Sequence, residues 1–238
     1  MQLFHIDADK FHIKWNQIEI FPVPDLISQL RKVLRIKKWD KICIQYNESN
    51  ATNRFELSIL DWTDQKLNWK IVSNQNFSFS EKNISMLIAM PNKREKAELI
   101  VQKLTEIGVQ NIYFWPSERS VIRQWNEKKA ERLDKISREA VEQSRWIMLP
   151  EIKFLKSDQE IRDLIGWKNV IIANMNWISI SELKWNFSGD MYWIVGPEWW
   201  FSESDLSLFC DAKIIDLGNN VLRMETASIV LAWLLKNI

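Results

Sequence analysis

The stretch Ile194–Phe201, with the sequence IVGPEWWF, decides how the second half of this chain is interpreted. The apolar run Met191–Val195 leads into it and predicts a buried strand, which Gly196-Pro197 ends abruptly. Ser202 and the acidic residues after it have the composition of a helix start. A strand, a tight turn and a helix N-terminus together present backbone N–H groups to a ligand. We therefore expect a ligand-binding loop, in which the bulky pair Trp199-Trp200 is unusual.

Outward from this loop, apolar strands alternate with amphipathic helices from residue 84 onward. Buried strands are expected at Ile84–Met90, Asn111–Phe114, Val170–Ala173 and Lys213–Leu217, and helices at Glu95–Ile107, Glu127–Arg145, Ser202–Phe209 and Thr226–Lys236. Ser157 and Glu160 form the pattern of a capping box, and the helix that they begin is expected to end at Gly166. This alternation predicts an α/β domain with a mainly parallel sheet.

The first 75 residues have a different pattern. Short strands are expected at Gln2–Ile6, Lys41–Gln45, Phe55–Leu60 and Lys70–Val72. One helix is expected at Asp25–Arg35, with Leu26, Leu30, Val33 and Leu34 on its buried face. The sequence therefore predicts a small β-barrel or sandwich at residues 1–75 and the α/β domain at 76–238, joined through the polar stretch Ser73–Lys82.

The composition is that of an ordinary globular protein, with 46% hydrophobic and 26% charged residues in a chain of 238. The net charge of +1 gives no global basic field for nucleic acid. Locally, Gln29–Ile44 holds six cations against Asp40, which indicates either a solvated face or a phosphate-binding surface.

The cysteines and histidines predict the cellular compartment and whether the protein binds a metal. Cys43 and Cys210 lie in separate apolar runs, which favours free thiols in a reducing compartment, so we expect a cytoplasmic protein. His5 and His12 have no partners at ligand spacing, so no metal site is expected. The charged N-terminus argues against a signal peptide, and the longest apolar run, Ile229–Leu235, is too short to span a bilayer.

Glycine and tryptophan occur in unusual amounts. The chain has 5 glycines and 14 tryptophans, whereas an average domain of this length would have roughly 17 glycines. The glycine shortage is about as large as the tryptophan surplus. Seven tryptophans directly adjoin Asn or Asp, where turn glycines are common: Trp15, Trp39, Trp62, Trp69, Trp125, Trp177 and Trp185.

Four segments in order resemble one family. They are KLTEIGV at 103–109, SERS at 117–120, EAVEQSR at 139–145 with PEI at 150–152, and GPE at 196–198 with LGNNVLRMETA at 217–227. The run Val33-Leu34-Arg35 matches as well. Together they resemble the bacterial enzymes that methylate N3 of a uridine in 16S ribosomal RNA, within the SPOUT class of knotted methyltransferases. The ordered set covers almost the whole chain.

The resemblance implies a PUA-like RNA-binding barrel followed by an α/β domain with a C-terminal trefoil knot. It also implies S-adenosylmethionine as methyl donor, and an obligate homodimer with the active site at its interface. The expected substrate is 16S rRNA or the small ribosomal subunit; a SPOUT methyltransferase acting on another RNA, such as tRNA, is an alternative.

The resemblance also implies roles at the site. Arg223 is expected to stabilise the uridine anion, and Glu198 to take the N3 proton, to orient Arg223 or to cap the following helix. Leu222 packs on the donor or belongs to the core, and Thr226 binds the donor or caps the last helix. The full set expected to hold the donor is Val195, Gly196, Pro197, Trp199, Trp200, Leu217, Gly218, Leu222 and Thr226.

RNA contacts are expected from cations of both domains. Such contacts to phosphates position an RNA without reading its sequence. The candidates are Arg31, Lys32, Arg35, Lys37 and Lys38 in the first domain, and Arg119, Arg138 and Arg145 in the second. Arg138 and Arg145 have alternatives, which are pairing with Glu139 or Glu142 or a place at the dimer interface.

One departure connects the resemblance to the composition. The family's turn reads Gly-Pro-Glu-Gly-Gly-Phe, but this chain has Trp199 and Trp200 in place of the two glycines. We hypothesise that many tryptophans here are glycines in the organism, encoded by UGA codons that its ribosomes read as glycine. Trp115, Trp193 and Trp233 lie in apolar runs that suit real tryptophan. If Trp199 and Trp200 are genuine, their indoles fill the donor's space, and the alternative function is a catalytically inactive RNA-binding protein.

Overall fold

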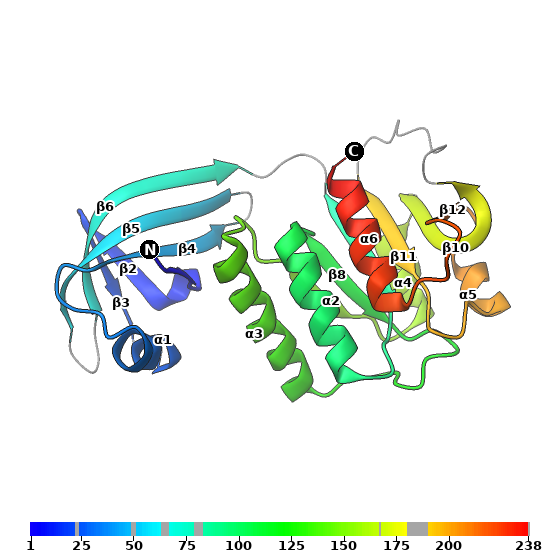
Figure 1. The fold of residues 1–238 in the computed structure, drawn as a ribbon, viewed down its shortest axis with the longest axis horizontal. Helices are drawn as coiled ribbons and strands as arrows, with labels where there is room; N and C mark the ends of the chain where they lie inside the picture. Colours follow the sequence, from blue (N-terminus) through cyan, green and yellow to red (C-terminus); the bar gives the residue numbers. More distant parts are fainter. Residues whose placement is uncertain are drawn as a thin grey trace. The chain divides into compact units, whose positions relative to one another are not determined.

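Two six-stranded sheets organise the chain (Figure 1). The computed structural model describes residues 1–21, 24–48, 51–62, 67–78, 83–166, 168–179 and 190–237. The contacts divide the chain into two units, residues 1–79 and 80–238. Each unit has its own apolar core.

The first unit is a curved, mostly antiparallel sheet in the order β1-β4-β5-β6-β3-β2. Among its described strands, β1 and β4 pair in parallel and the other neighbours pair antiparallel. Its strands are β1 (Leu3–His5), β2 (Phe11–Lys14), β3 (Gln17–Ile20), β4 (Lys41–Glu48), β5 (Ala51–Trp62) and β6 (Leu67–Ser78). Apolar side chains that alternate along these strands, such as Ile18, Ile20, Ile42 and Ile44, fill the core.

The helix expected at Asp25–Arg35 is shorter than its apolar pattern suggests. The α-helix α1 (Pro24–Ser28) gives way to a π-helical turn η2 (Gln29–Val33), and a 3₁₀ turn η1 (Ala8–Lys10) precedes β2. Leu26 and Leu30 are buried as expected, but Val33 is 72% exposed. The prediction that Val33 and Leu34 share the buried face was wrong, because the wider π turn rotates them out of the 3.6-residue period.

The second unit has an all-parallel sheet in the order β12-β10-β11-β7-β8-β9. Its strands are β7 (Ile84–Ala89), β8 (Asn111–Trp115), β9 (Glu151–Phe154), β10 (Asn169–Ser179), β11 (Met191–Val195) and β12 (Lys213–Asp216). β7 and β11 are buried along their whole length. The prediction of a parallel sheet covered on both faces, drawn from the continuous apolar runs, is therefore confirmed.

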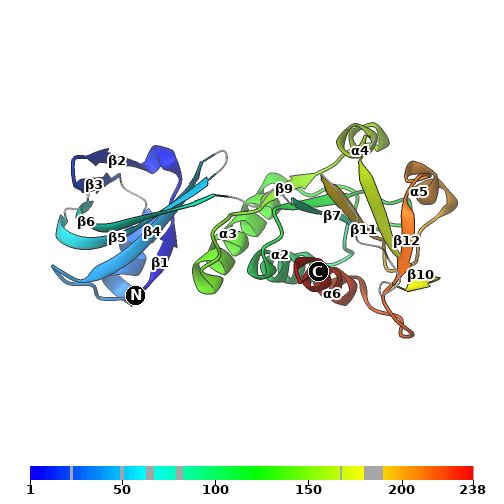
Figure 2. The same ribbon diagram turned by 90° about the horizontal axis from the view of Figure 1, so that it is seen from above.

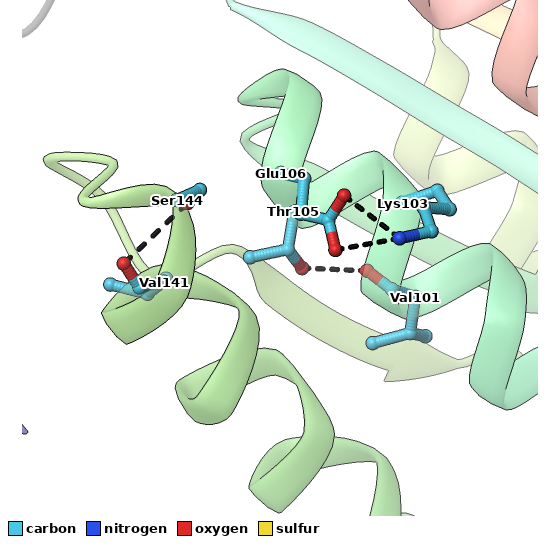
Figure 3. Close-up of polar contacts among 6 residues, drawn as sticks. All are labelled: Val101, Lys103, Thr105, Glu106, Val141 and Ser144. Carbon is cyan, nitrogen blue, oxygen red and sulfur yellow. Dashed lines mark hydrogen bonds and ion pairs between the residues drawn. The ribbon is translucent and has the colours of Figure 1, made fainter.

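Helices cover both faces of this sheet (Figure 2). On one face lie α2 (Arg94–Ile107), α3 (Glu127–Ser144) and α6 (Met224–Lys236), and on the other α4 (Asp158–Ile165) and α5 (Glu203–Leu208). Gly108 ends α2 with φ 95°, as its C-terminal stop requires. Figure 3 shows how the motif at 103–109 is used: Thr105 donates to the Val101 carbonyl oxygen at 2.7 Å, and Lys103 binds both carboxylate oxygens of Glu106.

Helix caps differ in detail from the sequence pattern. Ser157 accepts from the Glu160 amide at 3.3 Å, but the Glu160 carboxylate accepts from the Lys156 amide, so only half of the expected capping box forms. A complete box occurs at α5, between Ser202 and Asp205. Thr226 is no cap, because α6 begins at Met224 after Arg223 as N-cap residue.

Candidate functional site

A pocket of about 590 Å³ opens at the carboxyl ends of four parallel strands. The loops after β11 and β12 form most of it, together with the segment before α2, the first turn of α2, and Ala173 and Asn174 of β10. The volume is typical of sites for small organic ligands. It is lined by Asn92, Lys96, Ala173, Asn174, Val195, Gly196, Pro197, Glu198, Trp199, Trp200, Phe201, Asp216, Leu217, Asn220, Val221, Leu222, Arg223, Met224 and Ala227.

Most of the residues singled out in the sequence meet in this pocket. Both candidate catalytic residues, Glu198 and Arg223, line it. Of the nine residues expected to hold a donor, Gly218 and Thr226 are absent from the lining. Thr226 is exposed on the first turn of α6. Gly218 has φ 125° and donates its amide to the Asp216 carboxylate at 2.9 Å, so it shapes the turn after β12.

Charged side chains cluster at the pocket. Lys96 Nζ lies 2.6 Å from Glu198 Oε1 and 3.6 Å from Glu225 Oε2. All three side chains are mostly buried, with 23%, 19% and 13% of their area exposed. Arg223 adds a second cation to the lining. A site of this kind can hold a polar ligand and stabilise an anion that forms in it.

Two hydrogen-bond systems fix the loop after β11. The Arg119 guanidinium donates to the Trp199 carbonyl oxygen at 2.7 Å. The buried Asp205 carboxylate accepts from the Ser117 hydroxyl at 2.7 Å, the Glu118 amide at 3.0 Å and the Ser202 amide at 3.1 Å. The SERS segment at 117–120 is thereby tied to the start of α5.

Gly196 is required at its position by close packing. A Cβ there would lie 2.6 Å from the Phe201 ring, which is closer than carbon atoms approach each other. The loop therefore folds tightly onto Phe201, which stacks on Trp115. Gly196 and Pro197 both line the pocket.

Several lining residues were not predicted from the sequence. Lys96 lies on the first turn of α2, and Asn92 and Asn174 follow the ends of the predicted strands Ile84–Met90 and Val170–Ala173. Their position after buried parallel strands was the available signal, because carboxyl ends of such strands meet at one edge. Nothing in the sequence pairs Lys96 with Glu198, 102 residues away.

The cations expected to contact RNA are mostly exposed. Lys32, Arg35, Lys37 and Lys38 are exposed around η2 and the turn before β4, and Arg31 is half-buried there. Arg119 bonds the loop after β11. Arg138 pairs with Asp134 at 3.0 Å, a partner that the sequence did not suggest. Arg145 ends α3 with φ 57° and is exposed.

Three tryptophans have a backbone conformation that favours glycine. Trp15, Trp39 and Trp200 have φ of 56°, 73° and 67°, among five non-glycine residues with positive φ in the described part of the chain. Trp15 is fully exposed, Trp39 is 63% exposed and Trp200 is 47% exposed. Trp15 and Asn16 form the two-residue loop of the β2–β3 hairpin, where Asn next to Gly is typical.

Adjacency to Asn or Asp alone was a poor guide to these positions. Trp69 adjoins Asn68 but lies fully buried in β6, and Trp125 packs against Phe114 and Phe154. Trp185 and the side chains of Trp62 and Trp177 lie outside the described part of the structure. The expectation that Trp115 and Trp193 suit real tryptophan agrees with their complete burial.

A second depression lies between α2 and α6. It is mostly apolar and lined by Lys103, Glu106, Ile107, Ile229, Val230, Trp233 and Leu234. Trp233 is more than half exposed. Within the described ranges, no helix is long and apolar enough to cross a membrane, and no group of three or more His, Cys, Asp and Glu side chains could hold a metal ion.

Comparisons with known proteins agree on one kind of relative. The family model described as "RNA methyltransferase domain" matches residues 79–236. Proteins named ribosomal RNA small subunit methyltransferase E match over most of their length. The protein of Rickettsia conorii is 27% identical over 215 residues, covering 85% of this chain and 83% of its own, and that of Bacillus subtilis is 26% identical, covering 95% and 93%.

Solved structures share the fold over the whole chain. The Neisseria gonorrhoeae ribosomal RNA small subunit methyltransferase E, bound to S-adenosylmethionine, has a TM-score of 0.82 at 18% identity and covers all of this chain and 97% of its own. A Legionella pneumophila methyltransferase, also in complex with this cofactor, has a TM-score of 0.80 at 22% identity, with coverage of 100% and 98%.

Proposed function

Because the chain belongs to the RNA methyltransferase family, we propose that it transfers a methyl group from S-adenosylmethionine to N3 of a uridine in 16S ribosomal RNA. The observation that carries this proposal is the pocket at the carboxyl edge of the sheet, where the candidate residues from 195–200 and 217–223 meet. The names of the relatives support small-subunit rRNA as substrate. Such a substrate supports a cytoplasmic location for the enzyme.

The pocket fits the donor in volume and lining. Backbone groups of Val195, Gly196 and Leu217 would hold the adenosyl part, with Leu222 packing beside it. When bound, S-adenosylmethionine supplies the methyl group on a sulfonium. The methyl group would pass from the sulfonium to N3, leaving a neutral thioether, and the N3 proton would pass to water. Arg223 is the cation that would stabilise the resulting uracil anion, and placing the base is the protein's main task.

We further propose finer features of the fold that the resemblance implies. The first unit is a PUA-like barrel whose exposed cations at residues 31–38 contact RNA phosphates. In the second unit, the loops 196–202 and 217–223 come from strands that flank β10 and converge on one pocket, which supports a trefoil knot in the C-terminal segment. Salt dependence of RNA binding tests the first proposal: replacing Lys32, Lys37 and Lys38 should lower both affinity and its salt dependence.

The function is tested on the ribosomal RNA itself. We expect 16S rRNA from a host strain lacking this gene to lose one N3-methyluridine, measured by mass mapping. Small subunits from that strain should regain the methyl group when incubated with the protein and S-adenosylmethionine. An unchanged 16S methylation pattern in the deletion strain would overturn the proposal.

The tryptophans decide whether the polypeptide is active, and we propose that Trp15, Trp39, Trp199 and Trp200 are glycine in the protein that its host makes. A bulky side chain at positive φ costs about 1–2 kcal/mol, whereas glycine adopts this conformation freely. The exposed indoles of Trp15 and Trp39 regain little of that cost through burial. Trp199 and Trp200 line the pocket, where glycines would leave more room for the donor.

Two measurements test this proposal. Peptides covering residues 15, 39, 199 and 200, from the protein isolated from its host, should have the mass of glycine. Calorimetry should show tighter binding of S-adenosylmethionine by the Trp199→Gly/Trp200→Gly protein than by the chain with both tryptophans. Tryptophan in the host peptides would contradict the proposal and favour the alternative function, an inactive RNA-binding relative.

We also propose a homodimer that forms through α6. The depression between α2 and α6 exposes Ile229, Val230 and Trp233 beside the closed ion pair of Lys103 with Glu106 (Figure 3). An apolar patch without net charge suits a second copy of the same surface. The opposite side of α6 carries Met224 and Ala227 into the pocket, so a dimer would stabilise the helix that shapes the site. Val230→Glu should give a monomer in sedimentation experiments; an unchanged oligomer would exclude this interface.

A further inference from the structure

Lys96 joins three separate elements at the pocket. It is the third residue of α2, Glu198 lies in the loop after β11, and Glu225 is the second residue of α6. Its ammonium nitrogen is 2.6 Å from Glu198 Oε1 and 3.6 Å from Glu225 Oε2. We propose that Lys96 is a positioning residue for methyl transfer, which holds Glu198 and the start of α6 so that Arg223 faces the base. This inference rests on the proposed function.

The charges at the pocket explain how one cation, Lys96, can position two segments. Lys96 and Arg223 balance Glu198 and Glu225, and all but Glu225 line the pocket. Glu225 Oε2 is buried and accepts no hydrogen bond among the described residues, so the Lys96 ammonium is the cation that compensates it. Partly buried ion pairs are screened less by salt than exposed ones. Lys96 therefore determines where both carboxylates lie.

Loss of Lys96 would change the partner of Arg223. Without the ammonium, Glu198 and Glu225 would be two mostly buried carboxylates, and Arg223 would be the remaining cation in the lining. Glu198 would then turn toward Arg223, and their pairing would neutralise the cation needed for the uracil anion. The expected defect is in the chemical step, because Lys96 acts through Glu198 and Arg223.

The same contact limits what Glu198 can do. Its Oε1 already accepts a short hydrogen bond from Lys96, so one carboxylate oxygen is occupied. The geometry thus favours an orienting role for Glu198 over general base catalysis. The charged hydrogen bond from Lys96 fixes the orientation of the Glu198 carboxylate before the substrate binds.

The test compares Lys96→Met and Lys96→Arg with Arg94→Met, in the protein with Trp199→Gly and Trp200→Gly. Arg94 is the matched control, because it pairs with Glu98 at 3.1 Å on the same helix and does not line the pocket. We expect Lys96→Met to lower the single-turnover rate on small subunits by about 10²-fold, the scale of a misplacement of roughly 1 Å. Donor affinity from calorimetry should change by less than about threefold, roughly half of a tenfold step in free energy. Lys96→Arg should restore most of the rate, and Arg94→Met should leave it unchanged.

A second variant keeps the test valid if Lys96→Met folds poorly. Lys96→Met/Glu225→Gln removes the cation together with the deeper carboxylate, so the local charge stays balanced. The proposal requires the rate loss to persist in this variant. Full activity in either Lys96→Met variant, or a rate loss matched by an equal loss of donor affinity, would overturn it.

Hydrogen exchange does not depend on catalysis, so it tests the role of Lys96 separately from the proposed function. The Trp200 amide donates to the Pro197 carbonyl oxygen within the loop that Glu198 belongs to. Lys96→Met should speed hydrogen exchange in residues 196–202 and at the start of α6, and Arg94→Met should not. If the parent protein fails to methylate 16S rRNA, the proposed function is wrong, and this exchange still decides whether Lys96 positions the two segments. Unchanged hydrogen exchange in Lys96→Met would overturn the inference, whether or not the parent protein methylates 16S rRNA.

Discussion

The Arg119 guanidinium donates a 2.7 Å hydrogen bond to the carbonyl oxygen of Trp199, 80 residues farther along the chain. Arg119 belongs to the segment after β8, and Trp199 belongs to the loop after β11. In the sheet, β7 lies between these two strands. An arginine that the sequence suggests as an RNA contact therefore also holds the loop that lines the pocket.

Arg119→Ala should loosen this loop and weaken donor binding. A hydrogen bond from a charged group contributes roughly 1.5–3 kcal/mol, and solvent exposure of Arg119 places the effect at the lower end. We expect the dissociation constant for S-adenosylmethionine to rise about tenfold by calorimetry. Arg123→Ala is the control, because Arg123 bonds the Glu118 carbonyl oxygen within its own segment. Equal losses in both variants would argue against a specific role for the Arg119–Trp199 contact.

Asp205→Asn should destabilise the second unit. The carboxylate is buried and accepts three hydrogen bonds from two segments, and an amide would place a donor where one oxygen now accepts. Leaving buried donors unsatisfied predicts a loss of about 2–4 kcal/mol in the free energy of unfolding. Urea denaturation measures it. Ser202→Ala, which removes the cap hydroxyl alone, should cost about 1 kcal/mol; a similar cost for both would show that the link to Ser117 and Glu118 adds nothing.

Trp15→Gly and Trp39→Gly should each raise the free energy of unfolding by roughly 1 kcal/mol, because both residues have positive φ and exposed indoles. Replacing tryptophan by glycine normally destabilises a protein, so the sign of the change is diagnostic. Trp69→Gly is the contrasting variant, since its fully buried indole fills the core of the first unit. It should cost at least about 3–5 kcal/mol. Destabilisation by Trp15→Gly would contradict this prediction, because it would show that contacts of the indole more than offset the backbone strain at Trp15.

Alkaline pH should weaken the second unit through Tyr113. Burial, followed by the nearby charge of Glu151, raises the pKa of the Tyr113 hydroxyl well above its ordinary value of 10.0. The folded state therefore retains this proton where the unfolded state has lost it, so stability is intact below pH 10 and declines as pH rises above it. Urea denaturation between pH 8 and 11 should show this decline, and Tyr113→Phe should make it shallower. An identical pH dependence in Tyr113→Phe would exclude the tyrosine as its source.

Patterns of local sequence predicted the second unit better than the first. Continuous apolar runs and 3.6-residue periodicity located β7, β8, β11, α2 and α3 within one or two residues, because each element repeats its burial pattern over its whole length. The short strands β2 and β3 were missed, since the hairpin loop that joins them contains Trp15 in place of a residue that signals a turn.

The site was predictable only where its residues are contiguous. The loop 195–200 and most of 217–223 follow from sequence, and both line the pocket. Lys96 could not be found, because its contacts with Glu198 and Glu225 depend on the strand order that brings α2 beside α6. The cap role expected for Thr226 failed for a local reason: the helix begins two residues earlier, at Met224.

The order of strands in the second sheet also affects how the chain folds during synthesis. β11 lies between β7 and β10, so the inner edge of β7 pairs with residues that the ribosome makes about a hundred positions later. Until residues 191–195 emerge, the apolar strand β7 has one edge without hydrogen-bond partners, a template for pairing with other chains. Translation pauses or truncation before β11 should therefore yield aggregates, and chaperone dependence of this protein should be concentrated in that interval.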